Sequence, residues 1–264
     1  MSEPTPITSR DNPLLKRLRV LAQDNTAYRK QGQVWLEGDH LCRALLARQL
    51  RPAMALFGDS AWARADPALK HAALRVHTTP DVLMAGISGL ESPAGMGFVW
   101  DLPADSGPQS GVPTVVLDRL QDAGNVGSIL RSAAAMGFVQ VLAIKGTAAL
   151  WSPKVLRAGM GAHFGLRLVE GLAAEALGSL EVPLLVTSSH EGEWLHKTEL
   201  PWPCAWVMGH EGQGVGEAVA AMATRSVRII QPGGEESLNV AAAAAVCLHA
   251  SACGAPLQSG SRSS

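Results

Sequence analysis

The chain has 264 residues, and 47% of them are hydrophobic, which supplies enough apolar side chains for one large domain or two ordinary ones. No stretch approaches the roughly 20 uninterrupted apolar residues that a membrane-spanning helix needs, and the first residues lack the apolar core of a signal peptide. The four cysteines form neither a CxxC pair nor a disulfide framework. We therefore expect a folded protein of the cytoplasm without a membrane span or a metal site.

Charge is spread unevenly along the chain, although the net charge is only −1. Residues 1–51 hold 9 Lys and Arg against 5 Asp and Glu, a net charge of +4, and the rest hold 13 against 18, a net charge of −5. Lys and Arg bind nucleic-acid phosphates because the bound counterions are released. A small basic region on an acidic body fits selective binding of a nucleic acid better than nonspecific coating.

The first hundred residues alternate helical patterns with short apolar runs. The helical patterns lie near 12–22, 38–50 and 60–71, and the apolar runs near 33–36, 53–57 and 74–77. This alternation predicts a small α/β domain. Residues 101–113, rich in Gly, Pro, Ser and Asp, show no apolar periodicity and predict a linker. We place one domain at 1–102, the linker at 103–112 and a second domain at 113–264.

The second domain repeats the alternation with longer apolar runs. These lie at 114–117, 139–144, 183–187, 205–208 and 227–230, with helical patterns at 126–136, 215–223 and 239–252. Continuous apolar runs are typical of a parallel sheet that helices cover on both faces. Ligands of such sheets bind at the carboxyl ends of the strands, so the loops after these runs are the candidates for function.

The first candidate loop follows 114–117 and leads into a helix that ends at Gly137. Asn125 stands at the predicted N-cap, and capping alone explains both of these residues. Arg131 needs another explanation, because its helix is otherwise Ile, Leu, Ala and Ser and holds no Asp or Glu three or four residues away. Either an anionic ligand or plain surface charge accounts for Arg131.

Two more loops carry unusual sequences. Residues 209–216 contain four glycines, which let a backbone approach a flat ligand but also suit a tight turn. Within them, Glu211 is either a hydroxyl-binding carboxylate or a helix-starting one. Residues 231–240 precede an Ala-rich helix, for which Ser237 or Asn239 is a suitable N-cap.

In order, these loops resemble the three signature motifs of the SpoU/TrmH RNA 2'-O-ribose methyltransferases, a family of the SPOUT superfamily. The matching segments are Asn125-Val-Gly-Ser-Ile-Leu-Arg131, Met208-Gly-His-Glu-Gly-Gln-Gly214 and Glu236-Ser-Leu-Asn-Val240. Residues 7–16 and 36–38 are similar to the accessory N-terminal domain that many members use for RNA. The resemblance covers most of the chain, and three ordered motifs arise by chance far less often than one.

The resemblance implies an α/β fold: a SPOUT-type parallel sheet with a C-terminal trefoil knot, preceded by a small L30e-like α/β domain that binds RNA. The knot follows from the resemblance alone, since chains are almost never knotted. Family members are homodimers whose active site draws on both subunits, and we expect the final Ala-rich helix at the dimer interface. The sequence departs from the family at Ala123 and Ile230, where proline is common, and at Gly159, where serine is frequent. His163 is expected to be structural.

The resemblance also implies which residues form the site. Binding of S-adenosyl-L-methionine is assigned to Thr187, Gly209, Gly212, Ile229, Gln231 and Leu238. Catalysis is assigned to Arg131, Asn125, Glu211, Ser237 and Asn239. A guanidinium stays protonated, so we expect Arg131 to grip a phosphate and stabilise the emerging alkoxide while the other four orient it and the ribose. RNA contacts are assigned to Arg10, Lys16, Arg17 and Arg19 of the basic region.

The predicted function is S-adenosylmethionine-dependent 2'-O-methylation of a ribose in structured RNA, ribosomal RNA first and transfer RNA second. One alternative is a noncatalytic RNA-binding or assembly protein that keeps the fold, against which the intact motif residues argue. Another is a dinucleotide-dependent oxidoreductase with its phosphate loop at 209–216. That alternative lacks the acidic residue expected at the end of a following strand, where the chain has 228–230 instead.

Overall fold

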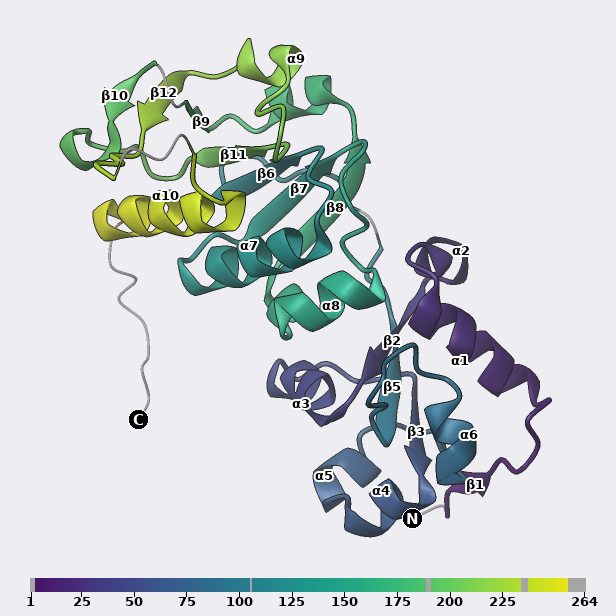
Figure 1. Cartoon of the computed structure of the whole chain (residues 1–264). Helices are drawn as coiled ribbons and strands as arrows, with labels where there is room; N and C mark the ends of the chain where they lie inside the picture. The colour runs from purple at the N-terminus through teal and green to yellow at the C-terminus, as the bar shows by residue number, and fades with distance from the viewer. Residues whose placement is uncertain (1–2, 105, 189–190, 234–236, 256–264) are drawn as a thin grey trace. The chain divides into compact units, whose positions relative to one another are not determined.

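The computed structural model describes residues 3–104, 106–188, 191–233 and 237–255. The chain divides into two compact units: unit 1 comprises Met1–Asp105 and Ala149–Gly165, and unit 2 comprises Ser106–Ala148 and Leu166–Ser264 (Figure 1). Among the described residues, no helix is long and apolar enough to cross a membrane. The same residues contain no cluster of His, Cys, Asp and Glu that could hold a metal ion.

The sheet of unit 1 has five strands in the order β1-β4-β3-β5-β2. They are β1 (Thr5–Pro6), β2 (Gln33–Glu37), β3 (Met54–Gly58), β4 (Val76–Thr79) and β5 (Met96–Asp101). β5 is antiparallel to both neighbours, whereas β4 pairs in parallel with β1 and β3. The three predicted apolar runs correspond to β2, β3 and β4. β1 and β5 were not predicted, because β1 has only two residues and β5 runs directly into the linker sequence.

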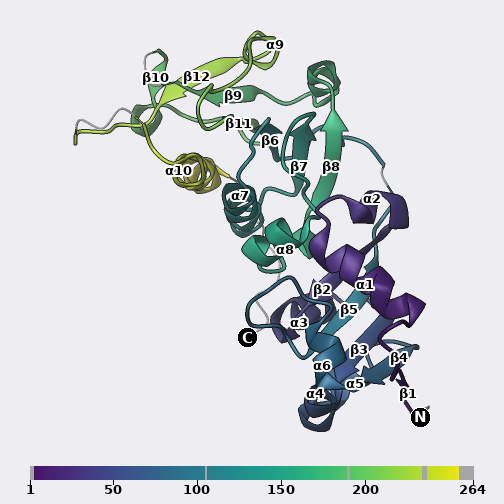
Figure 2. The ribbon, with the colours of Figure 1, turned by 45° about the vertical axis from the view of Figure 1, so that its right-hand side comes forward.

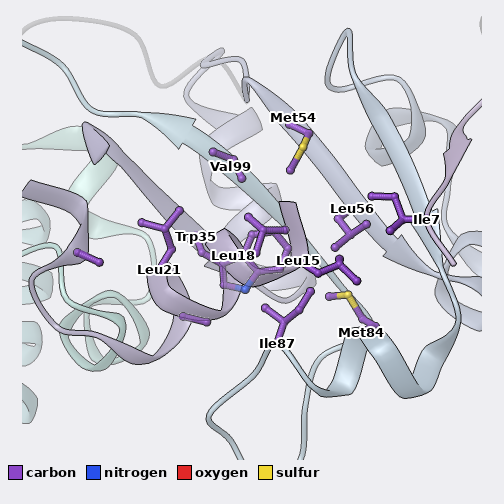
Figure 3. Packing of buried hydrophobic residues seen from close by; sticks show 12 residues of the cluster. Ile7, Leu15, Leu18, Leu21, Trp35, Met54, Leu56, Met84, Ile87 and Val99 are labelled. Carbon is purple, nitrogen blue, oxygen red and sulfur yellow. The ribbon is translucent and has the colours of Figure 1, made fainter. Parts of the chain in front are cut away.

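Helix α1 (Pro13–Gln23) forms the core of unit 1 with this sheet. The Asn12 side chain accepts a hydrogen bond from the Leu14 N–H at 2.8 Å and caps the helix, and Pro13 fits its first turn. Leu15, Leu18 and Leu21 recur at helical spacing and are buried together with Trp35 and Val99 (Figure 3). The remaining helices of unit 1 are α2 (Ala27–Gln31), α3 (Asp39–Ala47), α4 (Asp59–Arg64), α5 (Pro67–Lys70), α6 (Asp81–Ala85) and α8 (Pro153–Gly159).

Residues 149–165 pack with unit 1, although their sequence lies within the predicted 113–264 domain. Trp151 and Phe164 place their rings 5.6 and 5.5 Å from the ring of Trp100. His163 is buried and donates to the Leu150 carbonyl at 2.9 Å, and burial lowers its pKa to about 4. A Cβ on Gly159 would lie 2.4 Å from the His163 ring, so this ring occupies the space that a serine there would need. The functional division at 103–112 stays a prediction.

Unit 2 is built on a seven-stranded sheet in the order β10-β12-β9-β11-β6-β7-β8, and every pair in it is parallel. The strands are β6 (Thr114–Asp118), β7 (Gln140–Ile144), β8 (Arg167–Leu172), β9 (Leu184–Thr187), β10 (Glu193–Trp194), β11 (Ala205–Gly209) and β12 (Arg225–Arg228). Each of the five predicted apolar runs falls on a strand, but β12 ends at Arg228, so residues 229–230 lie beyond it. The predicted parallel α/β architecture is confirmed.

Helices cover both faces of this sheet. α7 (Ala123–Ala135) and α10 (Val240–Gly254) lie side by side on one face (Figures 1 and 2). The other face packs against Leu177 of the 3-10 helix Ala174–Ser179, Leu180 directly after it and Val219 of α9 (Glu217–Ala220). β6 has β7 on one side and β11 on the other, so the chain changes direction across the sheet at β6. Loops diverge at such a switch point, which opens a crevice at the carboxyl ends of the strands.

Candidate active site

The loops that follow β9, β11 and β12 surround a pocket of about 380 Å³ at the carboxyl end of the unit 2 sheet. This size lies within the range of roughly 300–1,000 Å³ that is usual for ligand pockets. Its lining comprises Thr187, Ser188, Gly209, His210, Glu211, Gly214, Val215, Ile229, Gln231, Ser237, Leu238, Asn239, Val240 and Ala243. Five of the six predicted cofactor residues and three of the five predicted catalytic residues are among them.

One chain of hydrogen bonds joins the three motif loops. The Glu211 carboxylate accepts from the backbone N–H groups of Gln121 and Asp122, at 3.3 and 3.2 Å, and from the Asn125 amide at 3.3 Å. The Asn125 side-chain oxygen accepts in turn from the Asn239 amide at 3.0 Å. Residues from three separate loops are therefore held at fixed positions relative to one another beside the pocket.

Two helices begin at this site, and the sequence predicted the N-cap of only one of them correctly. α7 begins after Asp122, whose carboxylate accepts from the Asn125 N–H at 2.7 Å. The predicted N-cap Asn125 was therefore wrong, and its side chain is free to bond Glu211 and Asn239. Asn239 does cap α10, because its side-chain oxygen accepts from the N–H groups of Ala241 and Ala242 at 2.9 and 3.2 Å.

Glu211 is a stabilised carboxylate. Partial burial by itself raises the pKa of its carboxyl group, but hydrogen bonds from its own backbone, from Asn125 and from the Asp122 and Gln121 N–H groups lower that pKa by more. The net effect is a pKa below the ordinary value for glutamate. Glu211 is thus ionised at neutral pH and acts as a permanent acceptor for the loop before α7.

Asp118 and Arg119 were not predicted as site residues. Asp118, the last residue of β6, is buried, and its carboxylate accepts from the Gly216 N–H at 2.6 Å and from the Arg119 Nε at 3.0 Å. Arg119 also donates to the Gln213 side-chain oxygen at 3.2 Å. These contacts tie the middle and the C-terminal end of the glycine-rich loop to β6 and the residue after it. The signal in the sequence was an Asp at the end of a buried strand, because aspartate is almost never buried without a partner.

Two glycines of the 209–216 loop are required by its tight turn. The backbones of His210 and Gly214 pair through two hydrogen bonds of 3.0 and 2.8 Å, and Gly214 has a φ of +67°. A Cβ on Gly209 would lie 2.4 Å from the Gly214 backbone, so only glycine fits there. Gly212, a predicted cofactor residue, does not line the pocket, and its N–H donates to the His210 side chain at 3.0 Å.

Arg131 lies apart from the pocket. It is exposed in the middle of α7 and is absent from the pocket lining. Its side chain makes no hydrogen bond or ion pair with the residues that the structure describes. Within one copy of the chain, Arg131 therefore has no partner among the other predicted catalytic residues.

The predicted RNA contacts all lie in unit 1 but differ in their surroundings. Arg10 and Arg17 are exposed. Lys16 is exposed as well and forms an ion pair with Asp11 at 2.9 Å. Arg19 donates its Nε hydrogen to the Gly86 carbonyl at 2.8 Å, so it also holds the segment after α6 against α1. Their contact with RNA stays a prediction.

Comparisons with known proteins identify the family of the chain. The model of the SpoU rRNA Methylase family matches residues 113–249, which is more than half of the chain and contains all three motifs. The chain belongs to the SpoU rRNA methylase family. The predicted family, the enzyme class of RNA ribose methyltransferases and the methyl donor S-adenosylmethionine are therefore confirmed at the level of the family.

Individual relatives of this SpoU family member agree. An uncharacterized tRNA/rRNA methyltransferase of Synechocystis sp. is 33% identical over 255 residues, 92% of each chain. A 23S rRNA (guanosine-2'-O-)-methyltransferase of Bordetella pertussis is 36% identical over 52% of this chain, which spans only 58% of that enzyme. An AdoMet-bound rRNA methyltransferase of Sinorhizobium meliloti has the same fold, with a TM-score of 0.81, 23% identity and coverage of 95% of this chain and 98% of its own.

Proposed function

We propose that the chain is a 2'-O-methyltransferase that acts on a ribose of structured ribosomal RNA and takes its methyl group from S-adenosylmethionine. The observation that carries the proposal is the hydrogen-bonded series Glu211–Asn125–Asn239, which joins all three motif loops at the rim of one pocket. The guanosine-2'-O specificity named for the Bordetella pertussis relative supports a ribosomal ribose as the target. Transfer RNA is the second candidate, because the Synechocystis relative is named for both RNAs.

The pocket fits a nucleoside-containing donor. Ile229, Leu238 and Val215 provide apolar walls of the kind that cover a flat base. The side-chain oxygen of Gln231 is buried and accepts no hydrogen bond within the described residues, so it is available for a ligand N–H group. S-adenosylmethionine, when bound, supplies a methyl group already activated on a sulfonium. We propose that Thr187, Gly209, Ile229, Gln231 and Leu238 hold it.

The chemical task left to the protein is to position a ribose hydroxyl and to stabilise the charge that develops on it. Positioning of reacting groups is worth about 7–11 kcal/mol in well-oriented systems. Glu211 fixes Asn125 and the loop before α7, and Asn239 is fixed by its own cap bonds to α10. The N-terminus of α10 lines the pocket, and the Asn125–Asn239 hydrogen bond joins the first turn of α7 to it; helix N-termini favour phosphate and alkoxide oxygens. Ser237 adds a hydroxyl group at the rim.

Arg131 requires a second subunit in this proposal. It lies outside the pocket of its own chain and has no partner among the described residues. A homodimer formed through α7 and α10 would bring Arg131 of one copy to the pocket of the other. There its guanidinium would grip a phosphate and stabilise the emerging alkoxide, because it stays protonated at every relevant pH.

Further parts of the proposal concern the fold and the setting. The C-terminal part of unit 2 is proposed to form a trefoil knot, as the family resemblance implies. Unit 1 is proposed to be an L30e-like domain that presents Arg10, Lys16, Arg17 and Arg19 to RNA. The reaction is proposed to take place in the cytoplasm, as predicted from the sequence.

The proposal is tested by separating donor binding from transfer. Arg131→Ala should remove most turnover in a single-turnover assay and leave the calorimetric affinity for S-adenosylmethionine within about twofold, because Arg131 does not line the pocket. Mixed dimers of Arg131→Ala and Asn239→Ala subunits should regain activity, since one of the two sites then has both residues. Equal losses of donor affinity and rate, or no regain in mixed dimers, contradict the assignment.

The two rival functions are separated by a direct assay. Stoichiometric binding of labelled S-adenosylmethionine with no binding of NAD excludes the oxidoreductase. Transfer of the label to unmethylated ribosomal RNA excludes the noncatalytic RNA-binding protein. Mapping of 2'-O-methyl positions in total RNA, with and without the gene, then identifies the nucleotide.

A further inference from the structure

Unit 2 has a second groove, of about 740 Å³, lined by residues of β10, β12 and the segment between β10 and β11. Figure 1 shows β10 beside β12 at one edge of the sheet. The lining of the groove includes Glu193, Trp194, Lys197, Thr198 and Arg225. None of these residues belongs to the three motifs or to the predicted site. The groove is open to solvent and its long side chains are polar at their ends, so it suits an extended, partly charged ligand.

Trp194, which lines the groove, stacks with Arg228, which lies beside it on β12. Trp194 and Arg228 are partners in the register of β10 and β12, and the guanidinium carbon of Arg228 lies 4.1 Å from the centroid of the Trp194 ring. The Arg228 Nε donates to the Gly192 carbonyl at 3.0 Å, which fixes the guanidinium plane. Both side chains are half-buried, so part of this planar stack faces solvent.

The pair adjoins the proposed donor pocket. Arg228 is the last residue of β12, and the next residue, Ile229, lines the pocket. The Ser188 N–H, from the loop that also lines the pocket, donates to the Val227 carbonyl at 3.0 Å. The chain therefore passes directly from Arg228, which stacks on a residue of the groove, to Ile229, which lines the pocket.

The charges of the groove favour a ligand that binds by stacking as well as by its phosphates. Lys197 and Arg225 are exposed, and Arg225 is held by a 2.7 Å hydrogen bond to the Glu199 carbonyl. Two carboxylates, Glu193 and Glu199, stand beside them, and Glu193 accepts from the Thr198 hydroxyl at 3.2 Å. This balance disfavours indiscriminate binding of polyanions, whose affinity comes from unopposed Lys and Arg.

We infer that Trp194 and Arg228 form a stacking platform for a nucleobase of the RNA substrate that flanks the methylated ribose. The inference rests on the proposed function and names where RNA lies on unit 2. Unpaired RNA bases stack on indole rings and on guanidinium planes, and the pair offers both. The base lies on the solvent-facing part of the stack, and Lys197 lies where the adjoining phosphate passes.

The test compares two tryptophans of unit 2. Trp194→Leu removes the platform, and Trp202→Leu is the matched control, because Trp202 is also half-buried but packs on Phe138 before β7 and β11 begin. With unmodified ribosomal RNA as the probe, the KM for RNA should rise about tenfold in Trp194→Leu, equivalent to ~1.4 kcal/mol. It should stay within about twofold in Trp202→Leu, and the Kd for S-adenosylmethionine should not change in either variant.

Arg228→Lys keeps the positive charge but removes the planar guanidinium group. This variant tests the stacking platform if Trp194→Leu does not fold. An RNA KM raised about as much as in Trp194→Leu supports stacking, because lysine provides a point charge without a flat surface. A wild-type KM in Arg228→Lys overturns it. Ultraviolet crosslinking with a short single-stranded RNA that contains 4-thiouridine should attach the label to Trp194, and labelling confined to unit 1 would contradict the platform. Failure of the wild-type protein to methylate RNA at all would refute the proposed function, whereas unchanged KM values in an active enzyme refute the platform alone.

Discussion

A buried polar side chain lies at each end of the unit 2 strands, at what we call the amino edge and the carboxyl edge of the sheet. The two side chains have different kinds of partners. At the amino edge, Gln140 bonds both backbone groups of Gln109 and the Thr114 hydroxyl, at 2.7, 3.1 and 3.0 Å. At the carboxyl edge, Asp118 binds Gly216 and Arg119. In the first network, the Gln140 amide uses its oxygen and its nitrogen to hold Gln109 of the linker. The second fastens a loop that lines the pocket.

The carboxyl edge is also where polar groups remain available to a ligand. Glu211 and Asn239 lie at the rim of the pocket, and the buried Gln231 oxygen accepts no hydrogen bond within the described residues. Buried polar residues alone therefore do not mark a functional site, because structural networks need them too. The combination of a fixed loop with unused hydrogen-bonding capacity distinguishes the two edges.

The largest expected effect is a difference in methyl-transfer rate between substitutions at the two edges. Glu211→Gln replaces an acceptor of three hydrogen bonds by an amide whose NH2 group would face backbone N–H donors. We expect the methyl-transfer rate to fall on the order of 100-fold, as when reacting groups are displaced by about 1 Å. The matched control is Glu181→Gln, in the loop before β9, where the carboxylate accepts from the Ser110 hydroxyl. Single-turnover rates within twofold of each other for these two variants would show that the edges do not differ.

A smaller effect is expected when the buried polar side chain of each edge is removed: both variants should lose stability, but only one should lose donor affinity. Asp118→Ala and Gln140→Ala each leave buried partners without a hydrogen bond, which costs about 1–3 kcal/mol of unfolding free energy. Of these two variants, Asp118→Ala alone should weaken binding of S-adenosylmethionine, by about tenfold, because Asp118 contacts the 209–216 loop and Gln140 does not. Chemical denaturation and calorimetry measure the two quantities. Equal donor affinities in the two variants would mean that the loop holds its position without Asp118.

Two substitutions of Asn239 distinguish its role as a helix cap from its role in positioning Asn125. Asn239→Ala removes the cap of α10 and should lower the unfolding free energy by about 1 kcal/mol. Asn239→Ser keeps a capping oxygen but loses the amide that donates to Asn125. We expect Asn239→Ser to be stable within a few tenths of a kcal/mol of the wild type and yet slower in methyl transfer. A wild-type rate in Asn239→Ser would show that the cap is the whole role of Asn239.

The smallest expected effect is a pH dependence of stability from Glu211. The folded-state pKa of Glu211 is lowered, so the unfolded state binds its proton first as the pH falls. The contribution is complete above the ordinary glutamate pKa and is lost as the pH falls through the lowered value. Unfolding curves of Glu211→Gln should therefore lose part of the acid sensitivity of the wild type, and those of Glu181→Gln should keep it. Identical acid sensitivity in all three proteins would argue that Glu211 is not stabilised as a carboxylate.

Much of the fold was predictable because continuous buried runs produce central parallel strands. Thr114–Asp118 and Ala205–Gly209 are buried along almost their whole length, which is why their apolar residues formed unbroken runs. β8 was not predicted, since most of its residues are only partly buried at the sheet edge, and β10 has two residues. Edge strands lack the signal because one of their sides faces solvent.

The sequence by itself determined the family and the three loops of the site, because motif residues are local in the chain and keep their order. It did not determine which residues meet. Glu211 and Asn125 are 86 residues apart, Asn239 and Asn125 are 114 apart, and their contacts depend on the strand order β9-β11-β6. Local spacing does not encode that order. Only the tertiary structure decided that Asp118 fastens the glycine-rich loop, that Asp122 caps α7 and that Arg131 lies outside the pocket of its own chain.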